Sequence, residues 1–406
     1  MTHPAVPAPR PATASAPDPA TAPATTSGST PGSGPGCTPG SAAGSVPRSA
    51  PRPGSGRGGR LYTLDGLRLI AALMVVAFHF IAFDDRGTPV WGVSTSEVFP
   101  TAHPFASYGW LGVQLFFLIS GFVICMSCWG RDVRQFAVSR VIRLYPAYWF
   151  AVLVTAAVML VSHGPKQTGI TASKILTNLT MLQEAIGVGD IDPAYWTLWA
   201  ELRFYLLFAV VAALGLTYRR VVVFCGLWLL LSVLGPHADN ELIDLFAMPG
   251  AAPFFVAGVV MFLMYRFGPT PVTWLLLGTS WLLAQNQLRF LMKTAEGSVR
   301  HSISWPVCLA VITVFYLLVL AVALGRLSFF NRRWLTTAGA LTFPLYLLHE
   351  QLGWEVFRRL HTSVAPGVLV GGVVAAMLVA AWLVHRFVER PSAKALKKWL
   401  APAAGG

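Results

Sequence analysis

The amino-acid sequence predicts an all-α integral membrane protein with about ten transmembrane helices. Hydrophobic residues make up 55% of its 406 residues and charged residues only 12%, whereas a soluble globular protein carries roughly 25% charged residues. The mean hydropathy is +0.60. The apolar residues gather in segments long enough to cross a bilayer, which excludes an ordinary soluble domain.

Ten apolar segments follow one another from Leu61 onward, and each predicts one membrane span. They cover residues 64–83, 109–129, 141–162, 195–217, 221–236, 250–267, 271–290, 305–325, 335–352 and 366–388. If the spans alternate in direction, most of the 30 Lys and Arg residues fall on the side of the N-terminus. Because cytoplasmic segments are enriched in bases, we expect both termini in the cytoplasm and a multi-pass protein of the plasma membrane.

The chain is expected to divide into three regions. Residues 1–60 are rich in Pro, Ala, Gly and Ser and contain no Leu, Ile, Phe, Tyr or Trp. They cannot bury a core, so we expect a disordered N-terminal tail. Residues 61–392 are predicted to form the transmembrane domain, and residues 393–406 a basic cytoplasmic tail.

The charge and cysteine content argue against several classes of function. The formal net charge is +13, but the bases recur between apolar segments instead of clustering on a soluble unit, so no nucleic-acid partner is expected. The five cysteines include a single C-x-x-C pair, which predicts neither a disulfide framework nor a metal centre. The sequence contains no P-loop and no HExxH zinc motif, and we expect no metal.

The first apolar segment carries two ionisable residues, Arg68 and His79, which are costly in lipid and therefore indicate function. They are eleven residues apart, so they share one helix face and lie about 16 Å apart along the axis. Histidine is the usual general base near neutral pH. The structural alternative is that Arg68 reaches the headgroups and His79 bonds to a neighbouring helix.

A second group of charges lies at the start of the third span. Arg140 and Arg143 are three residues apart and share a helix face. Two guanidinium groups at the cytoplasmic mouth of the bundle suit phosphate groups. The alternative is simple anchoring of the span by its bases.

Two further groups of polar residues lie in later spans. Glu201 and Arg203 are two residues apart in the fourth span, so they point to nearly opposite faces and each needs a partner on another helix. For Glu201 that partner could be Arg68 or His79, and the alternative is a structural ion pair between helices. The outer end of the ninth span carries His349, Glu350 and Gln351.

Several motifs, in order, resemble those of the acyltransferase 3 family of integral-membrane acyltransferases over about residues 61–392. LDGLRLIAALMVVAFHF resembles the family's first helix with its Arg-x10-His spacing, and RVIRLYPAYW resembles its Arg-x-x-Arg stretch. PAYWTLWAELRFYLL resembles the segment Trp-Ser-Leu-x-x-Glu-x-x-Phe-Tyr, with Thr197 in the place of serine. This sequence also contains three further segments that resemble motifs of the family: GWLGVQLFFLISGFVI, LTFPLYLLH and FVERP.

The resemblance implies transfer of an acyl group from a cytoplasmic donor, usually acyl-CoA, to a hydroxyl of a polysaccharide, lipid-linked sugar, peptidoglycan or macrolide acceptor. It implies that His79 and Arg68 are catalytic, and Glu201 is expected to orient one of them. It also implies that Arg140 and Arg143 hold the donor. The acceptor, the acyl chain length and an acyl-histidine intermediate are left open.

The resemblance adds expectations about the substrates. Acyl-CoA is expected as a co-substrate, with no bound cofactor. Further substrate-binding residues are predicted at Trp196, Tyr205 and His349.

The main alternative is a polytopic transporter without acyl-transfer chemistry, because ten spans with buried charges also suit a secondary carrier. Transporters often consist of two related halves. No such symmetry is visible in this sequence, so acyl transfer is the favoured interpretation.

Overall fold

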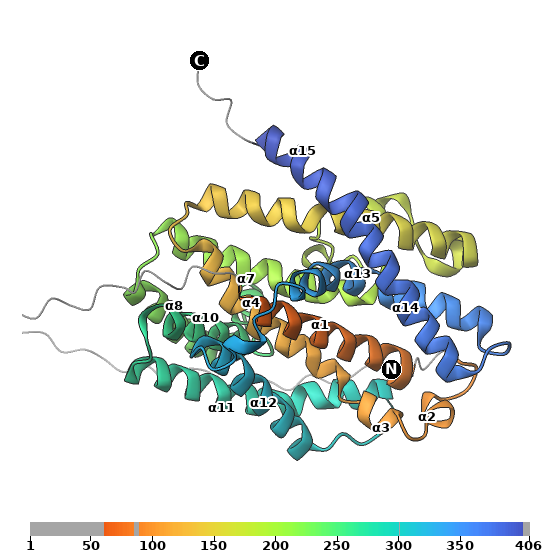
Figure 1. The fold of residues 1–406 in the computed structure, drawn as a ribbon, viewed down its shortest axis with the longest axis horizontal. Helices are drawn as coiled ribbons and strands as arrows, with labels where there is room; N and C mark the ends of the chain where they lie inside the picture. Colours follow the sequence, from red (N-terminus) through yellow and green to blue (C-terminus); the bar gives the residue numbers. More distant parts are fainter. Residues whose placement is uncertain (1–60, 85–88, 300, 401–406) are drawn as a thin grey trace, which may run out of the picture. The chain divides into compact units, whose positions relative to one another are not determined.

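The computed structural model describes residues 61–84, 89–299 and 301–400. The predicted tail at residues 1–60 lies outside the described residues, as do 85–88, 300 and 401–406. Within the described ranges, helices joined by loops account for the fold and no β-strand occurs. The prediction of an all-α protein is therefore confirmed (Figure 1).

Each of the ten predicted apolar segments coincides with one long helix. These helices are α1 (Tyr62–Ala77), α4 (Gly112–Cys128), α5 (Val133–Thr168), α7 (Trp196–Ala213), α8 (Tyr218–Leu234), α10 (Ala252–Phe267), α11 (Pro271–Val299), α12 (Trp305–Ala323), α13 (Leu335–Leu360) and α14 (Pro366–Val384). Shorter helices lie between them or after them: α2 (Thr95–Val98), α3 (His103–Ala106), α6 (Ala172–Leu179), α9 (Glu241–Ala247) and α15 (Arg390–Leu400).

Seven helical segments of the described chain are long and apolar enough to cross a membrane. They are Tyr62–Ala82, His103–Cys128, Val133–Thr168, Pro193–Ala213, Tyr218–His237, Trp305–Ala323 and Pro366–Lys398. The pair α9 and α10, bent by 45°, makes an eighth if it counts as one span. The helices α11 and α13 each carry several charged residues and are not among these segments, so ten crossings stay a prediction.

The helix α1 lies between α13 and α4, and its contacts with these two helices position the polar residues of the first span. Near the start of both helices, Gly339 of α13 lies against Asp65 of α1. Near their ends, the indole N–H of Trp354 donates to the carbonyl oxygen of His79 at 2.9 Å. The two helices therefore run parallel, as the first and ninth of ten alternating spans would (Figure 1).

The closest helix pair is α4 with α10, and two glycines allow it. A Cβ atom on Gly121 would collide with the backbone oxygen of Phe255, and one on Gly258 would collide with the backbone oxygen of Leu118. Small residues at such crossings let two backbones approach and gain van der Waals contact without any hydrophobic force between them in lipid.

We expect the Gly258→Ala substitution to destabilise the protein by about 1–3 kcal/mol, the usual cost of inserting a group into a full interface. The measurement is the melting temperature of the purified protein in detergent. Gly278→Ala in α11 is the matched control, because nothing lies within 4 Å of the added Cβ there. Equal melting temperatures for the two variants would contradict the close-contact account.

Candidate active site

A basic pocket lies between five helices of the bundle: α1, α4, α5, α7 and α13. It brings together residues that are far apart in the sequence. The predicted site residues that line it are Arg68 from α1, Arg140 and Arg143 from α5, and Glu201 and Tyr205 from α7. Residues without a predicted role complete it, among them Ser120 from α4 and Tyr346 from α13.

The basic pocket carries an excess of positive charge. Three guanidinium groups line it and a single carboxylate, that of Glu201, faces them. The Oε1 atom of Glu201 accepts a hydrogen bond of 2.7 Å from the Ser120 hydroxyl, which fixes the carboxylate to α4. Arg68 has two carboxylates within electrostatic reach, those of Glu201 and Asp65, and the three guanidinium groups still outnumber them. The pocket is therefore suited to an anion with several negative charges.

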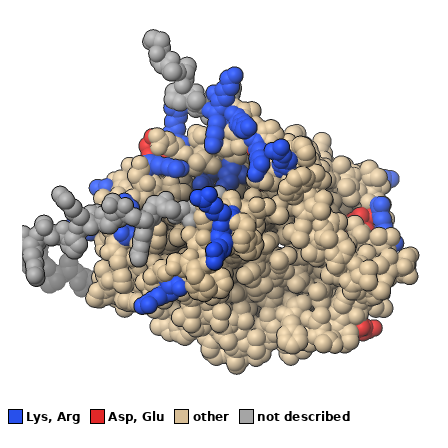
Figure 2. All heavy atoms as spheres, in the orientation of Figure 1, with Lys and Arg blue, Asp and Glu red and all other residues tan. Residues whose placement is uncertain are grey.

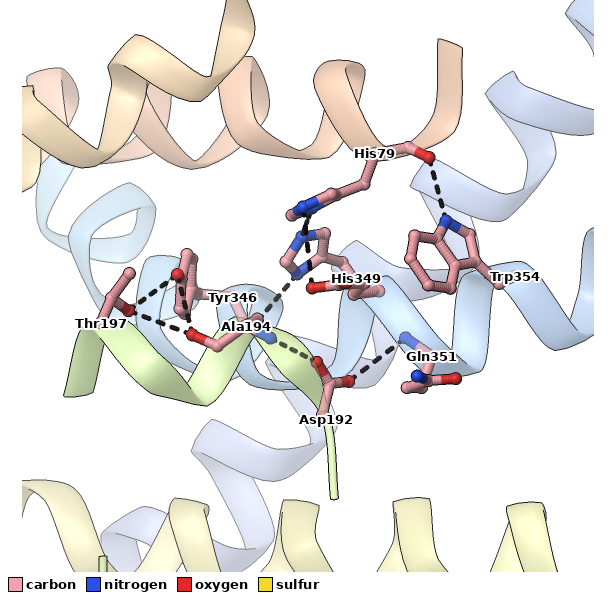
Figure 3. A network of polar contacts seen from close by, with 9 residues as sticks. His79, Asp192, Ala194, Thr197, Tyr346, His349, Gln351 and Trp354 are labelled. Atoms are coloured by element: carbon pink, nitrogen blue, oxygen red, sulfur yellow. Dashed lines mark hydrogen bonds and ion pairs between the residues drawn. The ribbon is translucent and has the colours of Figure 1, made fainter. Parts of the chain in front are cut away.

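His79 lies in a short π-helical turn, Phe78–Ala82, that ends α1. Such turns inside or at the end of α-helices often mark functional positions, because the extra residue per turn re-aims the side chains. The Nδ1 atom of His79 lies 2.8 Å from Nε2 of His349 on α13. Figure 3 shows the two rings facing each other across the gap between the helices.

The hydrogen bonds of His349 fix which nitrogen of His79 is free. The Nδ1 atom of His349 lies 2.8 Å from the carbonyl oxygen of Tyr346, and a carbonyl can only accept, so this nitrogen carries the proton. In neutral His349 the Nε2 atom is then an acceptor, and it must receive its bond from Nδ1–H of His79. The Nε2 atom of neutral His79 is therefore left with a lone pair, the form that a general base needs.

The free nitrogen of His79 faces a buried carboxyl group. Oε2 of Glu350 lies 3.7 Å from Nε2 of His79, and within the described part of the chain this oxygen has no hydrogen-bond partner. An imidazolium at His79 would be stabilised by the carboxylate at this distance. A hydroxyl oxygen about 2.8 Å from each of the two atoms would lie beside the line that joins them, because that line is shorter than two such distances.

The same three side chains could offer ligands to a metal ion. His79, His349 and Glu350 each present one ligand atom, all within 4.8 Å of one another. The facing nitrogens of the two histidines, however, are 2.8 Å apart, and two ligand atoms on one tetrahedral zinc ion would be about 3.3 Å apart at normal bond lengths. The separation fits a hydrogen bond between the rings better than a shared metal.

Two hydroxyl groups connect the basic pocket to the histidine pair. The Thr197 and Tyr346 oxygens lie 2.7 Å apart, and each is 3.1 Å from the carbonyl oxygen of Ala194. Because each hydroxyl has one proton, one of them donates to the other, and that other donates to the carbonyl oxygen. Tyr346 lines the pocket, and its ring centroid is 5.5 Å from that of His349. Tyr346 is thus a lining residue of the pocket that also lies next to the histidine pair, and Figure 3 shows Tyr346 and His349 together with Thr197 and Ala194.

The turn that carries Ala194 is tied to α13 by Asp192. Its carboxylate accepts hydrogen bonds from the backbone N–H of Ala194 at 3.0 Å and from that of Gln351 at 3.2 Å. Burial raises the pKa of Asp192 above its ordinary value, and the two N–H donors oppose that rise. These bonds fix the turn that carries Ala194 relative to α13, the helix that carries Tyr346 and His349.

The structure divides the predicted site residues between two places. Arg68 lies in the basic pocket and His79 in the histidine pair, which agrees with the separation expected along their helix. His349 contacts His79 instead of lining the pocket. Trp196 does not line the pocket and is 45% exposed. Arg203 finds its partner on another helix, because it donates to the carbonyl oxygen of Leu245 at 3.1 Å.

Sequence reasoning gave no role to several residues of the site. Ser120, Tyr346 and Glu350 all lie inside apolar segments that the resemblance covers or adjoins. A polar side chain in such a segment is a signal in itself, but the helix that it faces can be known only from the fold.

Residues 61–386 match the model of a family described as an acyltransferase domain, acyltransferase 3. That range covers well over half of the chain. No solved structure matches the chain.

Curated relatives match over parts of the chain. Nodulation protein 10 of Rhizobium leguminosarum bv. viciae is 27% identical over 40% of this chain and 47% of the relative. Acyltransferase MdmB of Streptomyces mycarofaciens is 29% identical over 37% of this chain and 38% of the relative. Exopolysaccharide production protein ExoZ of Rhizobium meliloti is 31% identical over 42% of this chain and 55% of the relative. The chain thus spans about half the length of these relatives.

Proposed function

Because the chain belongs to the acyltransferase 3 family, we propose that it is a membrane-bound O-acyltransferase that uses acyl-CoA as its donor. The acceptor is a hydroxyl of a carbohydrate, a lipid-linked sugar or a macrolide-type compound. The observation that carries the proposal is the arrangement of the site: a pocket with three arginines, and a histidine pair one tyrosine away from it.

The proposed topology has ten crossings of the plasma membrane, with both termini in the cytoplasm. The parallel course of α1 and α13 supports it, since nine alternating spans bring the first and the last into the same direction. In this topology the arginines at the start of α5 lie at the cytoplasmic end, where acyl-CoA is available. The long apolar helices agree with a membrane protein.

The donor is proposed to bind with its phosphates at Arg140 and Arg143. Arg68, deeper in α1, adds positive charge to the pocket, and Glu201 keeps the cluster ordered through its bond to Ser120. The uncharged arm that ends in the thioester then points toward Tyr346. The carbonyl carbon reaches the histidine pair past the Thr197 and Tyr346 hydroxyls, one of which could turn its proton from the Ala194 carbonyl to the thioester oxygen.

The acceptor hydroxyl is proposed to bind between Nε2 of His79 and Glu350. His79 takes the hydroxyl proton at Nε2 while the oxygen attacks the thioester carbonyl. The C–S bond breaks, the new ester C–O bond forms, and the thiolate of CoA recovers a proton, ultimately the one held by His79. His349 keeps the correct nitrogen of His79 free, and Glu350 stabilises the imidazolium formed in between.

His349 is a positioning residue in this scheme, and its substitution tests the hydrogen-bond order. We expect His349→Leu to lower kcat about tenfold or more, which is less than the roughly 10²–10⁴-fold contribution of the general base itself, with an unchanged KM for acyl-CoA. His349→Gln retains an oxygen that can accept from Nδ1–H of His79, so we expect it to recover part of kcat. Steady-state kinetics in membranes measure both. A purely structural role predicts equal kcat for the two variants at equal abundance.

The experiment for the proposed function is acyl transfer to a defined product. Membranes that contain the protein are given isotopically labelled acetyl-CoA and a panel of hydroxyl-bearing acceptors, and the acceptors are analysed by mass spectrometry. An acceptor that gains the labelled acyl group supports the proposal. Movement of an acceptor across sealed vesicles, with acyl-CoA left intact, would support a transporter instead.

A further inference from the structure

The end of the chain carries a row of bases on one side of a helix. α14 continues through a π-helical turn, His385–Glu389, into α15. Four bases recur here at intervals of four, four and three residues, which places them on one helix face. They line an open groove, called the α15 groove below, together with Phe387, Pro391 and Ala393; the four bases are Arg386, Arg390, Lys394 and Lys397.

The charge of the α15 groove is not balanced by the protein. From residue 366 to residue 400 the sequence contains one acid, Glu389, and its carboxylate is bonded to Nδ1 of His385 at 2.5 Å. Nε of Arg390 lies 3.2 Å from the other nitrogen of that histidine. In the part of the chain that the structure describes, no carboxylate pairs with Arg386, Lys394 or Lys397. A multiply charged anion would relieve this repulsion.

The α15 groove adjoins the basic pocket. Both α15 and the turn before it pack against α5, the helix that supplies Arg140 and Arg143 to the pocket. Glu389, in that turn, lies within electrostatic reach of Arg143. Figure 2 shows Lys and Arg side chains gathered where α15 leaves the other helices and around a hollow beside it. The two cationic surfaces are therefore neighbours, one deep and one open.

We propose that the α15 groove binds the nucleotide end of the acyl donor. This inference rests on the proposed use of acyl-CoA, whose anionic charge is divided between a diphosphate and a separate 3′-phosphate on the adenosine. Two neighbouring clusters of bases match that division: the diphosphate at Arg140 and Arg143 in the basic pocket, the 3′-phosphate at Lys394 and Lys397 in the α15 groove. Phe387, 65% exposed in the groove, offers its ring to the adenine base.

The bases of the α15 groove could instead attract anionic lipid headgroups, as basic segments beside a membrane span do. A bound nucleotide and a bound lipid headgroup lead to different expected results when acyl donors of different length are compared. A nucleotide site matters only for a donor that carries the nucleotide. A lipid contact holds the helix in place whichever donor is used.

The test compares acetyl-CoA, acetyl-dephospho-CoA and acetyl-pantetheine as donors for the triple variant R390Q/K394Q/K397Q. We expect KM for acetyl-CoA to rise roughly ten- to hundredfold with kcat unchanged, the effect of losing one or two charge-assisted bonds. KM for acetyl-pantetheine should not change, and acetyl-dephospho-CoA should show a smaller rise than acetyl-CoA. The matched control is R326Q/R332Q/R333Q, which removes three exposed bases from the loop between α12 and α13 and should leave all three donors unaffected.

Three results would overturn the inference: an equal effect of the triple variant on acetyl-pantetheine, no effect on any donor, or the same effect from the control variant. A wild-type protein that transfers from none of the donors would contradict the proposed function instead. The α15 groove is then tested by equilibrium binding of adenosine 3′,5′-bisphosphate to the wild type and the triple variant. Weaker binding by the triple variant supports the nucleotide site, and equal binding contradicts it.

Discussion

Replacement of His79 by alanine is expected to lower the rate of acyl transfer by roughly 10²–10⁴-fold, the contribution of a positioned general base. The reason is geometric: Nδ1 of His79 is engaged with His349, and Nε2 is the nitrogen left to take the acceptor proton. We expect KM for acyl-CoA to stay nearly unchanged, because the ring lies outside the basic pocket. Initial rates at saturating donor and acceptor measure the loss.

Two further variants separate catalysis from folding. His79→Gln can still donate to Nε2 of His349 but cannot act as a base, so we expect it to be as inactive as the alanine variant and closer to the wild type in thermal stability. His237→Ala removes an exposed histidine that bonds only locally, to the carbonyl oxygen of Val233, and should retain full activity. Near-normal transfer by either His79 variant, at equal abundance, would refute the base assignment.

Replacement of Arg143 by glutamine is expected to raise KM for acyl-CoA roughly ten- to hundredfold, since one charge-assisted hydrogen bond to a phosphate contributes about 1.5–3 kcal/mol. Unlike the α15 variant, it should also raise KM for acetyl-phosphopantetheine, which keeps the phosphate nearest the arm. Acetyl-pantetheine, which has no phosphate, should be used equally well by both proteins. Donor titrations of the initial rate give each KM.

The controls for this prediction lie on the same helix. Arg134→Gln removes an exposed guanidinium outside the pocket and should leave KM unchanged. Arg143→Lys keeps the charge but loses the planar fork, so we expect an intermediate KM. If Arg143→Gln impairs acetyl-pantetheine as strongly as acetyl-CoA, the residue does not bind phosphate and acts on the fold.

Much of the helical framework could be predicted from the sequence, because hydropathy is a local property. All ten apolar segments proved to be helices. The shared face and wide separation of Arg68 and His79 followed from helix geometry alone, and the structure places them in different parts of the site. The three-residue spacing of Arg140 and Arg143 likewise put both on the face that lines the basic pocket.

The contacts between helices could not be predicted in the same way. His79 and His349 are 270 positions apart, and nothing in either segment shows that α1 and α13 pack side by side. Glu350 follows His349 in the sequence, yet its distance to Nε2 of His79 depends on how the two helices are rotated. Hydropathy predicts the number of crossings less directly, because α11 and α13 each carry several charged residues and neither is among the helical segments apolar enough to cross a membrane.

The most direct test of the central claim is the release of free CoA thiol by membranes that contain the protein, followed with and without a hydroxyl acceptor. If the protein transfers acyl groups by way of His79, free CoA is released from acyl-CoA only when the acceptor is present, and the His79→Ala variant releases none. No acceptor-dependent release from any acyl-CoA, together with no binding of CoA to the folded protein, would contradict acyl transfer and favour a transporter.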